Sequence, residues 1–201
     1  FVVGEVGGAA AGPISTLAAG VGAAVFADPQ SGLRAGPGAL CAVPHADLLA
    51  AAGVLDELRP DVVVRWGALP TSKATWRWLE GHPEVPQLLV DRRGRDPLRS
   101  SRWISTADPG AAAAAVIATS PPPPAWTVRW EDLGAAAAKA TDEALAAAVF
   151  PNEPAIAAAV VASAPAGSAL FVGSSMPIRD VDSFAAPRLR PLSIYANRGA
   201  N

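Results

Sequence analysis

The chain has 201 residues, of which 51% are apolar and 17% are charged. This composition excludes a wholly disordered chain and is enough for one large domain, or for one domain and part of a second. The net charge of −2 argues against nucleic acid as the main partner, because such proteins usually carry a basic excess. No apolar stretch is long enough for a membrane-spanning helix. The single cysteine, Cys41, excludes an internal disulfide and fits a cytoplasmic protein.

Short β-branched runs alternate with alanine- and leucine-rich segments along the chain. This alternation favours an α/β fold with a parallel, doubly wound Rossmann-like sheet flanked by helices. The expected strands cover residues 1–3, 24–26, 61–66, 87–90, 103–105, 169–172 and 193–195. The expected helices cover residues 13–20, 45–58, 73–80, 109–118, 130–149, 154–164 and 177–184. Pro13 and Pro109 suit the first turns of their helices, and Ser72 suits a helix cap.

Four consecutive prolines mark the clearest break in the pattern. They cannot continue a helix, so residues 121–124 are expected to form a linker. Residues 1–120 would form the first domain, and residues 125–201 would begin a second, incomplete α/β domain. The chain starts without an initiator methionine and ends within an expected loop, which suggests a fragment of a longer protein.

In open α/β sheets, ligands bind beyond the carboxyl ends of the strands, so the residues after each expected strand are the candidate site residues. The glycine-rich turn at residues 4–8 lacks the spacing of the dinucleotide and P-loop motifs and indicates a tight strand-to-helix turn. After strand 61–66, Lys73 follows Ser72 at a helix start, where backbone N–H groups and a cation favour an anion. A capped and solvated helix start would show the same pattern.

Ser174 and Ser175 follow the expected strand 169–172, and Pro177 suits the first turn of the next helix. Ser175 and Arg179 are four residues apart and would share one helix face. A hydroxyl, free helix N–H groups and a guanidinium would then converge, which suits a carboxylate or phosphate. An ordinary cap, with the arginine paired to a nearby aspartate, is the structural alternative.

Asn197 and Arg198 follow the last expected strand, at the same edge of the same sheet. With the serines and the first arginine, they predict a clamp for a dicarboxylate or a keto acid. The mixed-charge loop 91–96 is interpreted as solvated. His45 and His82 have no partner at ligand spacing, so no metal site is expected, and no residue shows the pattern of a catalytic group.

Two motifs near the end of the chain carry a resemblance to one enzyme family. They are the Ser-x-x-x-Arg pattern of Ser175 and Arg179, and Asn-Arg-Gly-Ala-Asn at residues 197–201. Supporting segments occur in the family's order at residues 27–34, 44–49 and 65–73. The chain resembles the 2-succinyl-5-enolpyruvyl-6-hydroxy-3-cyclohexene-1-carboxylate synthases, which are thiamine diphosphate-dependent enzymes of menaquinone (vitamin K2) biosynthesis.

The resemblance implies a transferase that decarboxylates 2-oxoglutarate and adds the succinic semialdehyde unit to isochorismate, with thiamine diphosphate and Mg²⁺ or Mn²⁺ as cofactors. It assigns the chain to the family's central domain and the opening of the diphosphate-binding domain. The activating glutamate and the metal motif would lie outside, so we expect the chain alone to be inactive. The full-length protein is expected to be a homodimer or a homotetramer. The substrate-binding residues that the resemblance implies are Ser175, Arg179, Arg198, Lys73, Asn197 and Ser174.

One position and two other functions stay open. Ala74 stands where some relatives have a second basic residue after the lysine, which weakens that part of the substrate contact. The chain could instead be a non-catalytic Rossmann-like domain that binds an anion or a nucleotide, although the missing glycine motif disfavours a dinucleotide. It could also belong to another thiamine diphosphate enzyme of the acetolactate synthase type. An upstream domain with a glutamate and a downstream Gly-Asp…Asn motif would separate these functions.

Overall fold

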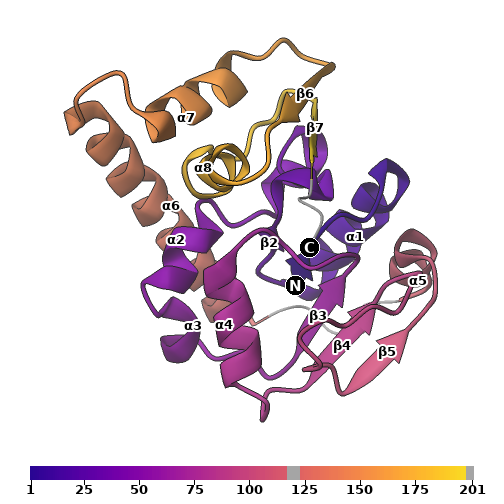
Figure 1. Cartoon of the computed structure of the whole chain (residues 1–201). Helices are drawn as coiled ribbons and strands as arrows, with labels where there is room; N and C mark the ends of the chain where they lie inside the picture. Colours follow the sequence, from indigo (N-terminus) through magenta and orange to yellow (C-terminus); the bar gives the residue numbers. More distant parts are fainter. Residues whose placement is uncertain (117–122, 198–201) are drawn as a thin grey trace.

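A computed structural model describes residues 1–116 and 123–197 (Figure 1). Five parallel strands form one sheet in the order β2-β1-β3-β4-β5. They are β1 (Val2–Val3), β2 (Phe26–Ala27), β3 (Val63–Trp66), β4 (Gln87–Val90) and β5 (Trp103–Ser105). This strand order and the parallel pairing are those of a doubly wound α/β fold, so the predicted fold class is confirmed.

Helices cover both faces of this sheet because neighbouring residues of a strand point to opposite faces. Val3 packs in one apolar cluster with Ile14, whereas its neighbour Val2 packs in another with Leu79 and Trp130. The helices of this part are α1 (Gly8–Val21), the 3₁₀ turns η1 (Pro29–Ser31) and η2 (Gly36–Leu40), α2 (Ala46–Ala51), α3 (Val54–Glu57), α4 (Lys73–Gly81), α5 (Pro109–Ala115) and α6 (Pro124–Ala147).

A second sheet has two parallel strands, β6 (Ser168–Val172) and β7 (Leu192–Ala196). Two helices accompany it, α7 (Glu153–Ser163) and α8 (Met176–Phe184). Alternate strand residues such as Val172 and Ile194 join a small apolar cluster with the two helices. The opposite face carries exposed side chains, among them Phe171 and Tyr195.

Two sequence predictions about helices are wrong. The expected helix 45–58 is broken into α2 and α3, because Gly53 takes a left-handed backbone with φ of 82°, which ends one helix and starts the next. Pro13 lies inside α1 and not in its first turn, because that helix already begins at Gly8. The helix therefore continues through a residue that cannot donate a backbone hydrogen bond.

The end of the expected linker at residues 121–124 overlaps a helix. Pro123 precedes α6 and Pro124 begins it, whereas residues 121–122 lie outside the described residues. The first half of α6 packs on the five-stranded part, where Trp126 and Trp130 join the same apolar cluster as Val2. The boundary between a domain at 1–120 and a second one at 125–201 stays a prediction. Within the described residues, no helix is both long and apolar enough to span a membrane.

Candidate functional site

Ser174 and Ser175 lie in the turn between β6 and α8, and both are exposed. Ser175 is the residue before the helix, as predicted, but its side chain makes no capping hydrogen bond. Its φ of 73° lies in a region that costs a non-glycine residue on the order of 1–3 kcal/mol, and such residues are frequent at binding sites. The Ser175 hydroxyl and the start of α8 therefore face solvent together.

Arg179 is exposed on the first turn of α8. Its Nη1 lies 3.9 Å from the sulfur of Met176, and no acidic partner is found for it among the described residues. Asp182, one candidate partner, pairs instead with the buried Arg34 at 3.0 Å. The structure therefore does not support the alternative in which Arg179 is neutralised by its own helix.

The other predicted site residues are placed in part. Lys73 is the first residue of α4 and is exposed, and Ser72 caps this helix by accepting a hydrogen bond from the Thr75 N–H at 3.1 Å. Asn197 is exposed directly after β7. It lies at the same sheet edge as the serine turn, because the register pairs the last residues of β6 and β7. Arg198 lies outside the described residues.

A buried arginine, Arg34, connects the five-stranded part to the end of α8 in the two-stranded part. Arg34 donates to the main-chain oxygens of Val181, Asp182 and Ala185, which belong to the last turn of α8. The Val181 oxygen also accepts from the Ala185 N–H, so the guanidinium adds a donor there, supplies one to the other two carbonyls and complements the negative end of the helix dipole. Next to it, the backbone of residues 34–36 forms a short parallel bridge with Arg188. Sequence reasoning missed this junction; its one signal was segment 27–34, which carries part of the resemblance.

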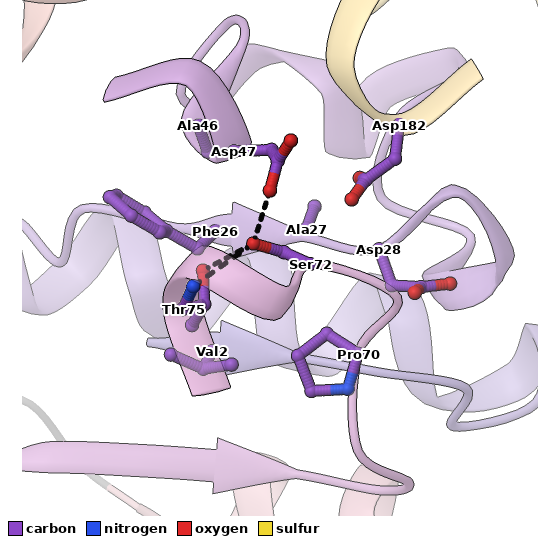
Figure 2. Close-up of a pocket in the computed structure, with 10 residues that line it drawn as sticks. All are labelled: Val2, Phe26, Ala27, Asp28, Ala46, Asp47, Pro70, Ser72, Thr75 and Asp182. Atoms are coloured by element: carbon purple, nitrogen blue, oxygen red, sulfur yellow. Dashed lines mark hydrogen bonds between the residues drawn. The ribbon is translucent and has the colours of Figure 1, made fainter. Parts of the chain in front are cut away.

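Three aspartates surround the junction (Figure 2). Asp28, Asp47 and Asp182 come from three different elements and line a cavity of about 10 Å³, which is room for about one water molecule. Asp28 accepts hydrogen bonds from the backbone N–H groups of Gln30 at 2.8 Å and Thr71 at 2.6 Å. The loop that leads into α4 is therefore tied to the loop after β2.

Burial shifts the pKa of two groups at this junction. It raises the pKa of Asp182 well above the ordinary 3.8, and Asp28 and Asp47 add to this rise against the opposing effect of Arg34. Burial also lowers the pKa of His45 below the ordinary 6.5. His45 Nδ1 lies 2.8 Å from the Ser183 carbonyl oxygen, so it acts as the donor in this contact.

The carboxyl edge of the five-stranded sheet carries a second concave region. A cavity of about 330 Å³ is lined by the 91–95 loop, with its three arginines, and by Glu5 and Asp91. Part of the 91–96 loop is anchored and not merely solvated, because Asp96 pairs at 2.9 Å with the buried Arg65 of β3. The glycines beside the cavity serve close packing: a Cβ on Gly4 would lie 1.7 Å from the Ala68 oxygen.

Comparison with known proteins gives a consistent result. No family model matches the chain. Curated proteins named 2-succinyl-5-enolpyruvyl-6-hydroxy-3-cyclohexene-1-carboxylate synthase are similar to it: 42% identical in Halobacterium salinarum over 93% of the chain, 35% in Geobacillus kaustophilus over 94%, and 35% in Bacillus pumilus over 88%. The chain spans about a third of the length of these relatives, 31–33%.

The similarity extends over most of the chain and confirms the resemblance that the Ser-x-x-x-Arg and Asn-Arg-Gly motifs indicated. It includes both the five-stranded part and the β6–β7 part, since 93–94% of the chain is aligned with two of the relatives. The chain therefore belongs to the 2-succinyl-5-enolpyruvyl-6-hydroxy-3-cyclohexene-1-carboxylate synthase family, of which it represents a segment.

Proposed function

We propose that the full-length protein containing this chain is a thiamine diphosphate-dependent transferase of menaquinone biosynthesis. It decarboxylates 2-oxoglutarate and adds the succinic semialdehyde unit to isochorismate. The proposal rests on the exposed guanidinium of Arg179, which has no acidic partner among the described residues and lies one turn after Ser175, whose hydroxyl makes no capping hydrogen bond. The names of the relatives supply the substrate class.

The substrates explain why cations and hydroxyls are needed in this part of the chain. Both carry carboxylates, which Arg179 can bind through two parallel charge-assisted hydrogen bonds. Ser174, Ser175 and the first N–H groups of α8 add donors at the positive end of the helix dipole. Asn197, Arg198 and Lys73 complete the proposed substrate-binding set. Their common task is to hold carboxylates so that the reacting carbons lie in contact.

Thiamine diphosphate is part of the proposal, but none of the described residues is assigned to bind it. When bound, thiamine diphosphate supplies the carbanion chemistry that decarboxylation of a 2-oxo acid requires. Within residues 1–116 and 123–197, no group of three histidine, cysteine, aspartate or glutamate side chains is arranged to hold a metal ion. We therefore assign none of them to Mg²⁺ or Mn²⁺. A homodimer or homotetramer and a cytoplasmic location stay predictions.

The test is a reaction balance with the full-length protein. With 2-oxoglutarate, isochorismate, thiamine diphosphate and Mg²⁺, we expect one CO₂ released for each isochorismate consumed, and no product when thiamine diphosphate is left out. Turnover of pyruvate in place of 2-oxoglutarate would favour the acetolactate synthase type. Anion or nucleotide binding without turnover of either 2-oxo acid would favour the non-catalytic alternative.

A further inference from the structure

Two residues of the proposed substrate-binding set come from different parts of the fold. Lys73 begins α4 beside the five-stranded sheet, and Arg179 lies on α8 beside the two-stranded one. The side chain of Asp47 links these two helices. Asp47, in the first turn of α2, accepts a hydrogen bond from Ser72 at 2.6 Å through Oδ1 and from Ser183 at 2.6 Å through Oδ2.

Each of the two serines is next to one of the proposed substrate-binding residues. Ser72 is the cap of α4 and directly precedes Lys73, and Figure 2 shows its bond to Asp47. Ser183 follows Arg179 by four residues on α8, which is about one helical turn. The two oxygens of the Asp47 carboxylate therefore link the start of α4 to the last turn of α8 through two hydrogen bonds.

Asp47 is well suited to this task because its neighbours have other partners. Arg34 is taken by Asp182 and by the α8 carbonyls, and Asp28 by two backbone N–H groups. Both bonds to Asp47 have the short length that is typical of a hydroxyl donating to an ionised carboxylate. Ser183 is held a second way, since its carbonyl oxygen accepts from His45.

We propose that Asp47 is a positioning residue that sets the separation of Lys73 and Arg179, and through it the placement of the substrate carboxylates. The inference rests on the proposed function. It names a residue that touches no substrate itself and acts through two serines. Because a misplacement of about 1 Å can reduce turnover on the order of 10²-fold, loss of either bond should affect catalysis more than folding.

The test is a double-mutant cycle in the full-length enzyme with its cofactors. Asp47→Asn keeps the size of the side chain but replaces one acceptor by a donor. We expect kcat/KM for isochorismate to fall roughly 10- to 100-fold. In a Lys73→Ala background, the same substitution should cost less than about threefold, because the separation then no longer matters. Asp132→Asn, on the exposed face of α6, is the matched control and should leave kcat/KM unchanged.

A second variant covers a folding failure of the first. Ser183→Ala removes only the α8 bond, and Ser183→Thr restores a hydroxyl; we expect the first to lower kcat/KM and the second to recover most of it at similar unfolding temperatures. Equal losses with and without Lys73, or a loss that follows the unfolding temperature, would overturn the positioning role. A wild-type enzyme that turns over neither substrate would instead refute the proposed function.

Discussion

The five-stranded sheet and the two-stranded sheet differ in how many of their faces are buried. The first sheet buries both faces, with Val3 and Ile14 on one side and Val2 and Trp130 on the other. The second buries one face and leaves Phe171 68% exposed on the other. Parallel sheets are normally covered on both faces, so the second sheet is covered less fully than the first.

Polar contacts from the first part help to hold the second part in place. Arg34 binds the carbonyl end of α8, and the backbone of residues 34–36 bonds to the backbone of Arg188. Within the second part, Arg188 donates to the main-chain oxygens of Val161 and Ala164 at the end of α7. Apolar burial on both faces therefore stabilises the first part, whereas directional bonds from Arg34, beside a smaller apolar cluster, hold α8 and with it Arg179.

We expect the largest loss of stability from a substitution in the apolar core of the five-stranded part. Trp130→Ala should lower the free energy of unfolding by about 3–5 kcal/mol, because it removes a buried aromatic side chain that contacts Phe26. Chemical denaturation measures the change, with Val128→Ala on the exposed face of α6 as the control, expected within about 0.5 kcal/mol. An equal effect of the two substitutions would contradict the packing of α6 on the first sheet.

The next effect tests the attachment of the second part. Arg34→Ala removes the donor of the buried Asp182 carboxylate and of the Asp182 and Ala185 carbonyl oxygens, so we expect a loss of about 3 kcal/mol in the free energy of unfolding. Hydrogen exchange should show that the amides of α8 lose protection before those of β3. Uniform loss of protection in both places would mean that the two parts unfold as one unit.

Arg179→Ala should change activity and not stability. If Arg179 binds a substrate carboxylate in the full-length enzyme, kcat/KM should fall, and the fall should correspond to a loss of roughly 2–3 kcal/mol of transition-state stabilisation. Its exposed side chain predicts an unfolding temperature close to that of wild type. Arg129→Ala, an exposed arginine on α6, is the control. A large fall in unfolding temperature would make Arg179 a structural residue.

The pH dependence of stability tests the buried junction. The lowered pKa of His45 means that the unfolded chain takes up its proton first, so this residue's contribution is present above pH 6.5 and is lost as the pH falls below it. The slope is at most about 1.4 kcal/mol per pH unit. His45→Asn keeps a donor and tolerates the left-handed backbone, and it should flatten the decline of stability between pH 6.5 and 5. An unchanged slope would show that His45 is not its source.

We expect the smallest change in stability from a substitution on the exposed face of the second sheet. Phe171→Ser removes an apolar side chain that is 68% exposed, so we expect a change within about 0.5 kcal/mol in the free energy of unfolding of this chain. Thermal denaturation against Val172→Ser, its buried neighbour in β6, measures the contrast. A large loss from Phe171→Ser would show that this face is covered.

The fold class and most of the site's local structure can be predicted from the amino-acid sequence. Continuous apolar runs identified β4 and β5 with their observed bounds, and Ser72 and Pro109 marked helix starts correctly. These signals are local: they depend on a few neighbouring residues and on backbone preferences that tertiary contacts did not override. The motifs around Ser175 also indicated the family, which the relatives confirm.

Which distant residues come into contact can be seen only in the tertiary structure. Nothing within residues 27–34 or 44–49 indicates that Arg34 caps α8 or that Asp47 joins Ser72 to Ser183. The bonded residues are 148 positions apart for Arg34 and Asp182, 136 for Asp47 and Ser183, and 25 for Asp47 and Ser72. The break at Gly53 was missed for a related reason, since a glycine with positive φ is distinguished from an ordinary helical one by the packing around it. Hydrogen bonds and charges act across space without a periodic trace in the chain, and for that reason the junction beneath the candidate site was visible only in the folded protein.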